Sequence, residues 1–199
     1  MNVFRYLSQH FPPMLITHPK FLDRKQLDSV ITEVCKNIDR QLCKMLRESD
    51  DESGSTGVIA IYDGRKHLFT VAGGLLDSMH SCIVCMHVCI NCDSVAGVGD
   101  SLCVLSRGGR AVVLNKMHRL DNETEIERIK QAGGTVLNSR VNGILAVSRA
   151  FGDTEFKGEE LVAGKVAGRL LIAEPEIYSE IITPMTEFAI IATDGLWDM

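Results

Sequence analysis

No hydrophobic run in this sequence is long enough to cross a bilayer. The longest stretch without a charged residue lies between Asp77 and Asp93, and its 15 residues fall short of the roughly 20 that a membrane helix needs. The N-terminus lacks the basic and then apolar layout of a secretory signal peptide. Lys and Arg number 21 against 26 acidic residues, and this net charge of −5, without an arginine-rich stripe, argues against a nucleic-acid partner.

The remaining composition is that of an ordinary globular protein. Of the 199 residues, 45% are hydrophobic and 24% are charged, values that exclude collagen-like and wholly disordered chains. Seven cysteines, an odd number in a chain without a secretory signal, indicate reduced thiols. We therefore expect one soluble, monomeric domain over residues 1–199, located in the cytoplasm or nucleus and without a nucleic-acid or membrane partner.

Apolar residues at helical spacing open the chain. They predict a helix over 2–11, which the pair Pro12-Pro13 should end, and a longer amphipathic helix over 23–48. Further along, Asn122 and Glu125 have the spacing of a capping box and predict a third helix.

Short apolar runs separated by turn residues make up most of the remaining sequence. Turns rich in Gly, Asp and basic residues indicate two antiparallel hairpins, 58–62 with 67–72 and 101–106 with 110–114. The pattern as a whole predicts an α+β fold with antiparallel sheets. Further strands are expected at 135–137, 144–148, 170–173 and 188–193.

The segment 74–97 fits neither pattern. A Val-Ala-Gly triplet at 71–73 recurs at 95–97, and joining 73 directly to 98 would give a better β-strand than the sequence as written. We therefore expect an inserted segment at 74–97, between sheet-core regions at 53–73 and 98–199, with the helices at 1–48. The insertion is rich in side chains that bind metals: His80, Cys82, Cys85, His87, Cys89 and Cys92.

These cysteines and histidines leave two interpretations open. Soft ligands at chelating spacing could bind Zn²⁺ or an iron–sulfur cluster. Only three residues separate the two Cys-x-x-Cys pairs, however, whereas zinc sites usually place about a dozen or more between them. We favour a poorly packed insertion without a metal, which translation of unspliced sequence would produce.

Acidic residues at strand ends are the strongest chemical signal. The apolar run 188–193 leads into Asp194 and a glycine, with Asp198 four residues later, and Asp100 follows a glycine at the end of another strand. A carboxylate held at a strand end suits Mg²⁺ or Mn²⁺, because these ions prefer oxygen ligands and retain several waters. Any single Asp-Gly pair also fits a simple turn.

Five motifs occur in order along the chain. They are Ser-Gly-Ser-Thr-Gly at 53–57, Val-Gly-Asp-Ser at 98–101, Val-Asn-Gly-Ile-Leu-Ala-Val-Ser-Arg-Ala-Phe-Gly-Asp at 141–153, Ala-Glu-Pro-Glu-Ile at 173–177 and Thr-Asp-Gly-Leu-Trp-Asp at 193–198. Together they resemble the metal-dependent type 2C (PPM) protein serine/threonine phosphatases. The resemblance covers nearly the whole chain outside the insertion, and it implies a four-layer α-β-β-α sandwich of two antiparallel sheets, here incomplete.

The resemblance also implies a mechanism. Two or more Mg²⁺ or Mn²⁺ ions would activate a bridging water for attack on the phosphorus of phosphoserine or phosphothreonine in phosphorylated protein substrates. Asp194 matches the family's metal-binding Asp-Gly, and Asp100 and Asp198 match positions associated with an additional, weaker metal. Arg149 and Asp153 match a stretch that we expect to be structural rather than catalytic.

The sequence departs from the family where its chemistry is densest. The family's Asp-Gly-His-Gly-Gly loop with its histidine, its phosphate-binding arginine and its later Asp-Asn are absent, so no catalytic residue is assigned and we expect a domain truncated at both ends. Asp63-Gly64 with His67 imitates the loop but has hairpin spacing. Asp121-Asn122 imitates the Asp-Asn pair but precedes a helix. Residues 117–120 also depart from the family's Asp-His-x-Pro.

These departures bear on activity. A bridged pair of ions needs several fixed oxygens on each ion, more than the remaining carboxylates supply. We therefore predict negligible phosphatase activity for the chain as written. The alternative is a phosphatase-like module that binds a partner without hydrolysis. Unchanged Asp100, Asp194 and Asp198 favour a truncated enzyme, because a true non-catalytic relative would be expected to have lost its carboxylates.

Overall fold

A computed structural model describes residues 2–23, 25–61, 69–72, 94–158, 161–162, 165–166, 169–180 and 183–199. The predicted turn at 62–68 and the cysteines and histidines at 80–92 lie outside the described residues. The helices are α1 (Val3–Ile16), α2 (Leu27–Glu48), α3 (Glu123–Gln131) and α4 (Asp194–Trp197), with a 3₁₀ turn η1 (Thr154–Lys157). The strands are β1 (Gly54–Ser55), β2 (Gly57–Ile61), β3 (Phe69–Ala72), β4 (Ser94–Val98), β5 (Leu102–Arg107), β6 (Arg110–Val113), β7 (Val136–Leu137), β8 (Arg140–Val141), β9 (Phe151–Gly152), β10 (Leu161–Val162), β11 (Lys165–Val166), β12 (Glu176–Ser179) and β13 (Thr186–Ala192).

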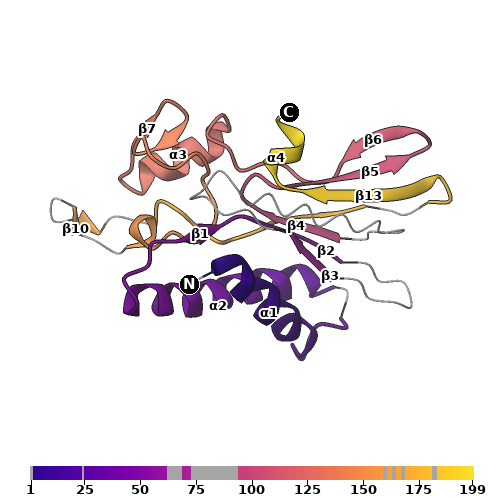
Figure 1. Cartoon of the computed structure of the whole chain (residues 1–199), viewed down its shortest axis with the longest axis horizontal. Coiled ribbons are helices and arrows are strands. Elements are labelled where there is room, and N and C mark those ends of the chain that lie inside the picture. Colours follow the sequence, from indigo (N-terminus) through magenta and orange to yellow (C-terminus); the bar gives the residue numbers. More distant parts are fainter. Residues whose placement is uncertain are drawn as a thin grey trace.

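Two antiparallel sheets lie at the centre of the molecule (Figure 1). The four-stranded sheet has the order β12-β4-β2-β3, and the three-stranded sheet has the order β13-β5-β6. Helices α1 and α2 lie on one side of the four-stranded sheet, and the three-stranded sheet lies on its other side. The predicted α+β sandwich of antiparallel sheets is confirmed.

Strand β2 shows why these layers pack together. All of its residues are buried. Because successive side chains of a strand point to opposite faces, Ile59 and Ile61 belong to the core shared with the two helices, whereas Val58 and Ala60 pack against the second sheet. The core on the helix side also contains Leu7, Phe11, Leu15, Ile31, Ile38 and Leu42.

Helix α1 extends further than the sequence predicts. Pro12 and Pro13 were expected to end it, but the helix continues through both residues to Ile16. Each proline removes a helical hydrogen bond and crowds the preceding turn, at a cost of about 3 kcal/mol or more. The extension places Leu15, fully buried, on the same face as Phe11, and burial of a leucine contributes roughly 1.5–3 kcal/mol. Two prolines cost more than burial of Leu15 alone returns, so we attribute the extension to packing of the whole buried face, which also contains Val3, Leu7 and Phe11.

The segment Ser94–Val98 corrects the expected end of the insertion. We placed 74–97 outside the sheet core, yet β4 lies within the four-stranded sheet between β12 and β2. Strands β3 and β4, which carry the two Val-Ala repeats, flank β2, and Ile59 pairs with Val71 on one side and with Ala96 on the other. Because both segments contain Val-Ala-Gly, the local sequence does not indicate which of them forms the strand between β2 and β12 and which forms the edge strand. An insertion at 74–93 stays a prediction.

Other expected elements are confirmed or shortened. The Asn122 side chain accepts a hydrogen bond from Thr124 N–H and caps α3, as predicted. The second half of the capping box does not form, because Asn122 N–H donates to Arg119 O and the Glu125 carboxylate accepts from arginines instead. The second hairpin pairs Arg107 with Arg110, as its Gly-Gly turn indicates. The runs 144–148 and 170–173 form isolated bridges instead of strands. Their apolar side chains pack with α3, and Ile129, Leu145, Val147 and Leu171 share one cluster.

Candidate metal centre

Asp100 and Asp194 are brought together by the pairing of β5 with β13. In this antiparallel pair Leu102 lies opposite Ala192. Asp100 precedes Leu102 by two residues and Asp194 follows Ala192 by two. The paired strand ends therefore bring the two aspartates to the same edge of the sheet, where their carboxyl groups interact.

A cavity of about 310 Å³ opens at this end of the sheets. It is lined by Asp100, Arg119, Leu120, Asp121, Ser139, Ala146, Asp194 and Asp198. The three carboxylates that the sequence analysis selected thus line one cavity. The sequence predicts Asp121 only at the start of a helix and predicts no role for Arg119. No local signal indicates that residues 119–121 lie beside α4.

The carboxylates in this cavity differ in their partners. Burial and the neighbouring Asp194 raise the pKa of Asp100 to about 6, although Arg119 acts in the opposite direction. Asp198 accepts a hydrogen bond from the Arg119 guanidinium in a partly exposed ion pair. The repulsion between Asp100 and Asp194 is of the kind that a bound cation relieves.

The turn that presents Asp100 rests on a buried polar support. Gly99 has a φ of +99°, and a Cβ atom there would lie 2.3 Å from the Thr56 side chain, so glycine is required. On the other side of Asp100 in the chain, Ser101 Oγ lies 3.2 Å from Thr56 Oγ1. The buried Asn115 side chain donates to Ser101 O at 2.9 Å and accepts from Cys103 N–H at 2.7 Å.

The carboxylates of the cavity fit one hydrated divalent ion better than a bridged pair of ions. Within the described part of the chain, no three His, Cys, Asp or Glu side chains converge as a metal-binding group. Asp100 and Asp194 nevertheless present adjacent hard oxygens, and Mg²⁺ is often held by one or two carboxylates with water as its other ligands. Asp198 would have to leave Arg119 to join them.

Comparison with known proteins decides the family. The family profile of protein phosphatase 2C matches residues 1–199. The chain belongs to the protein phosphatase 2C family. It is similar to "Probable protein phosphatase 2C 69" of Arabidopsis thaliana, with 36% identity over 197 residues that cover 98% of this chain and 45% of the relative. Its identity to "Probable protein phosphatase 2C 59" of Oryza sativa subsp. japonica is 35% over 198 residues, 98% of this chain and 48% of that protein. The chain thus spans about half the length of these curated relatives.

Solved structures support the type 2C fold. A structure described as a phosphatase from a pathogenic strain of Toxoplasma gondii matches with a TM-score of 0.61 and 22% identity, covering 98% of this chain and 64% of that one. A structure described as a C. elegans sex determining protein matches with a TM-score of 0.68 and 19% identity, covering 98% of this chain and 40% of that one. At these identities the likeness establishes the fold alone.

Arg149 has a structural environment in this type 2C chain, in agreement with the sequence analysis. Its guanidinium donates twice to the Glu125 carboxylate of α3, at 2.6 and 3.2 Å, and once to Glu174 O at 2.9 Å. Its side chain is largely buried, and it also pairs with Glu176 of β12 at 3.4 Å. Arg149 therefore joins α3 to β12 and does not line the carboxylate cavity.

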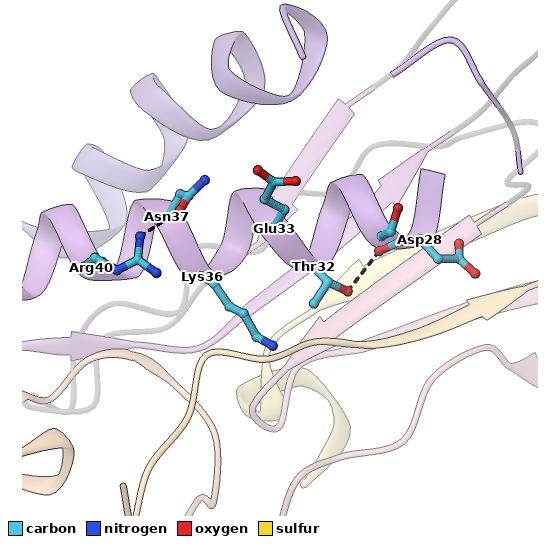
Figure 2. A pocket seen from close by; sticks show the side chains of 7 residues that line it. Asp28, Thr32, Glu33, Lys36, Asn37 and Arg40 are labelled. Atoms are coloured by element: carbon cyan, nitrogen blue, oxygen red, sulfur yellow. Dashed lines mark hydrogen bonds between the residues drawn. The ribbon is translucent and has the colours of Figure 1, made fainter. Parts of the chain in front are cut away.

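A larger depression, of about 450 Å³, lies along α2 (Figure 2). Its side chains belong to one exposed helix face and bond locally: Thr32 donates to Asp28 O, and Arg40 donates to Asn37. Lys36 pairs with Glu174 at 2.5 Å. Charged residues at helical spacing form such a face on any solvated helix, so we assign no chemistry to it.

Three cysteines lie within the described part of the chain. Cys35, Cys43 and Cys103 are buried, and Cys35 and Cys43 form no disulfide. Burial raises the pKa of the Cys35 thiol well above its usual range and, together with Asp39, raises that of Cys43 to about 11. The raised pKa favours the protonated thiol at Cys35 and Cys43. No described helix is both long and apolar enough to span a membrane.

Proposed function

We propose that Asp100 and Asp194 hold one Mn²⁺ or Mg²⁺ ion, and that the function of the domain type is metal-dependent hydrolysis of phosphoserine and phosphothreonine in proteins. The placement of these two aspartates at facing strand ends carries the proposal. In the family's complete site the metal supplies an activated water for attack on phosphorus. The contribution of this chain is to hold two adjacent carboxylates on a buried support, with Asp198 and Arg119 lining the same cavity.

Mn²⁺ binding tests the metal site directly. We expect Asp194→Asn to weaken Mn²⁺ binding at least about tenfold, because even loss of an outer-shell partner commonly costs that much. Electron paramagnetic resonance of free Mn²⁺ during a titration measures the change. Asp28→Asn, which removes an exposed carboxylate from α2, is the matched control. Equal affinity in both variants would contradict the proposed site.

The chain of 199 residues is expected to show no Mn²⁺-dependent hydrolysis of a phosphothreonine peptide. Its described carboxylates can hold a hydrated ion but not the bridged pair that positions the attacking water. Phosphate release measured with and without Mn²⁺ tests this expectation. A Mn²⁺-dependent rate that disappears in Asp194→Ala would show that this chain alone assembles an active site.

Arg119 should compete with the metal. Its guanidinium forms an ion pair with the Asp198 carboxylate. A metal ion that binds this carboxylate must therefore displace the guanidinium. Since a partly exposed ion pair contributes up to about 1 kcal/mol, we expect Arg119→Ala to tighten Mn²⁺ binding about two- to fivefold. Arg40→Ala on α2 is the control for lost positive charge. Weaker binding in Arg119→Ala would mean that the arginine instead orients Asp198 for the metal.

A further inference from the structure

A buried histidine lies beneath the turn that carries Asp100. The exposed fraction of His118 is 0%. The backbone N–H of Gly99 donates to the His118 side chain at Nδ1, at 3.0 Å. The backbone N–H of His118 donates in return to Gly99 O, at 2.8 Å. Both polar groups of the Gly99 backbone are thus satisfied by one residue, next to a proposed metal ligand.

His118 is itself firmly held. Ser148 donates to His118 O twice, from its N–H at 2.9 Å and from its hydroxyl at 3.0 Å. His118 Nε2 makes no hydrogen bond among the described residues and lies 3.8 Å from the Glu176 carboxylate. Glu176 is in turn held by Tyr178 and Arg149.

The protonation state of His118 follows from its surroundings. Burial, followed by the positive charge of Arg149, lowers the pKa of His118 to about 4. The imidazole is therefore neutral at neutral pH. Because Nδ1 accepts the Gly99 N–H, the proton of the neutral ring lies on Nε2.

We propose that His118 is a positioning residue, which holds the Gly99–Asp100 turn in the conformation that points Asp100 at Asp194. This inference rests on the proposed function, in which Asp100 binds the metal. Glycine at 99 can adopt many backbone conformations, so its own sequence does not select the observed φ of +99°. The Nδ1 acceptor selects it, because any rotation that breaks the bond leaves a buried N–H unpaired.

Two isosteric variants separate this role from simple packing. In His118→Asn the side-chain oxygen can take the place of Nδ1, whereas in His118→Gln it takes the place of Nε2. We expect His118→Gln to weaken Mn²⁺ binding about tenfold, as outer-shell losses do, and His118→Asn to stay within about threefold of the wild type. His10→Gln, at an exposed histidine, controls for lost imidazole.

Amide exchange at Gly99 gives a second readout that requires no metal. In ¹H–¹⁵N spectra this amide should be protected from exchange in the wild type and in His118→Asn, and exposed in His118→Gln. Wild-type Mn²⁺ affinity in His118→Gln, or equal loss in both variants while each remains folded, would overturn the positioning role. Failure of the wild type to bind Mn²⁺ would refute the proposed metal site instead, and an unprotected wild-type Gly99 amide would refute the hydrogen bond itself.

Discussion

Replacing Lys157 with Met is expected to lower the free energy of unfolding by about 3–5 kcal/mol, as loss of one partner from a buried ion pair does. Lys157 Nζ lies 2.6 Å from Asp39 Oδ1, and the two side chains are only 3% and 7% exposed. The ammonium group also donates to Ala150 O at 2.6 Å. Its removal leaves the Asp39 charge in the interior with only the weaker donors Gly152 N–H and the Cys43 thiol.

The Lys157 prediction has a matched control and a compensating variant. Lys36→Met breaks the Lys36–Glu174 pair, whose side chains are about half exposed, and should cost no more than about 1 kcal/mol. The double variant Asp39→Leu/Lys157→Met should recover part of the loss, because no buried charge remains, although Gly152 N–H loses its acceptor. Urea unfolding measures all three. A single-variant effect as small as that of Lys36→Met would contradict the buried pair.

Phe11→Ala is expected to destabilise the fold by about 3–5 kcal/mol, the usual cost of truncating a buried phenylalanine. The Phe11 side chain is 2% exposed and belongs to the core that α1 shares with α2 and β2. Truncation leaves a cavity that the surrounding Leu and Ile side chains cannot fill without moving, so both the transfer energy and the packing contacts are lost.

Leu22→Ala is the control for Phe11→Ala. Leu22 is 83% exposed, and its truncation should change stability by no more than about 0.5 kcal/mol. Leu15→Ala adds a test of the helix beyond the two prolines, since it should also be strongly destabilising if that last turn is docked. Equal unfolding midpoints for the Leu15 and Leu22 variants would show that α1 ends near Pro12, as its sequence alone predicts.

Sequence pattern predicted the parts of this protein whose cause is local. The apolar spacing of α2, the Asn122 cap of α3 and the Gly-Gly turn between β5 and β6 each depend on residues a few positions apart. The five family motifs likewise pointed to the family that the comparisons establish. Selection of Asp100, Asp194 and Asp198 from strand-end patterns was sufficient to find three side chains that line one cavity.

Interactions between distant segments could not be predicted in this way. Which Val-Ala repeat becomes the central strand depends on pairing with both β2 and β12. Continuation of α1 through Pro12 depends on burial of Leu15 against other elements.

Sequence by itself determined α2, the cap of α3, the turn between β5 and β6, the family and the candidate carboxylates, because caps, periodicity and motifs act within a few residues. Only the tertiary structure decided that β5 and β13 pair in the register that brings Asp100 and Asp194 to one edge of the sheet. The ion pair between Arg119 and Asp198 and the hydrogen bond between Gly99 N–H and His118 likewise come from the tertiary structure. Such contacts join residues whose separation in sequence carries no local signal, and they exist only once the sheets have packed and water has been excluded between them.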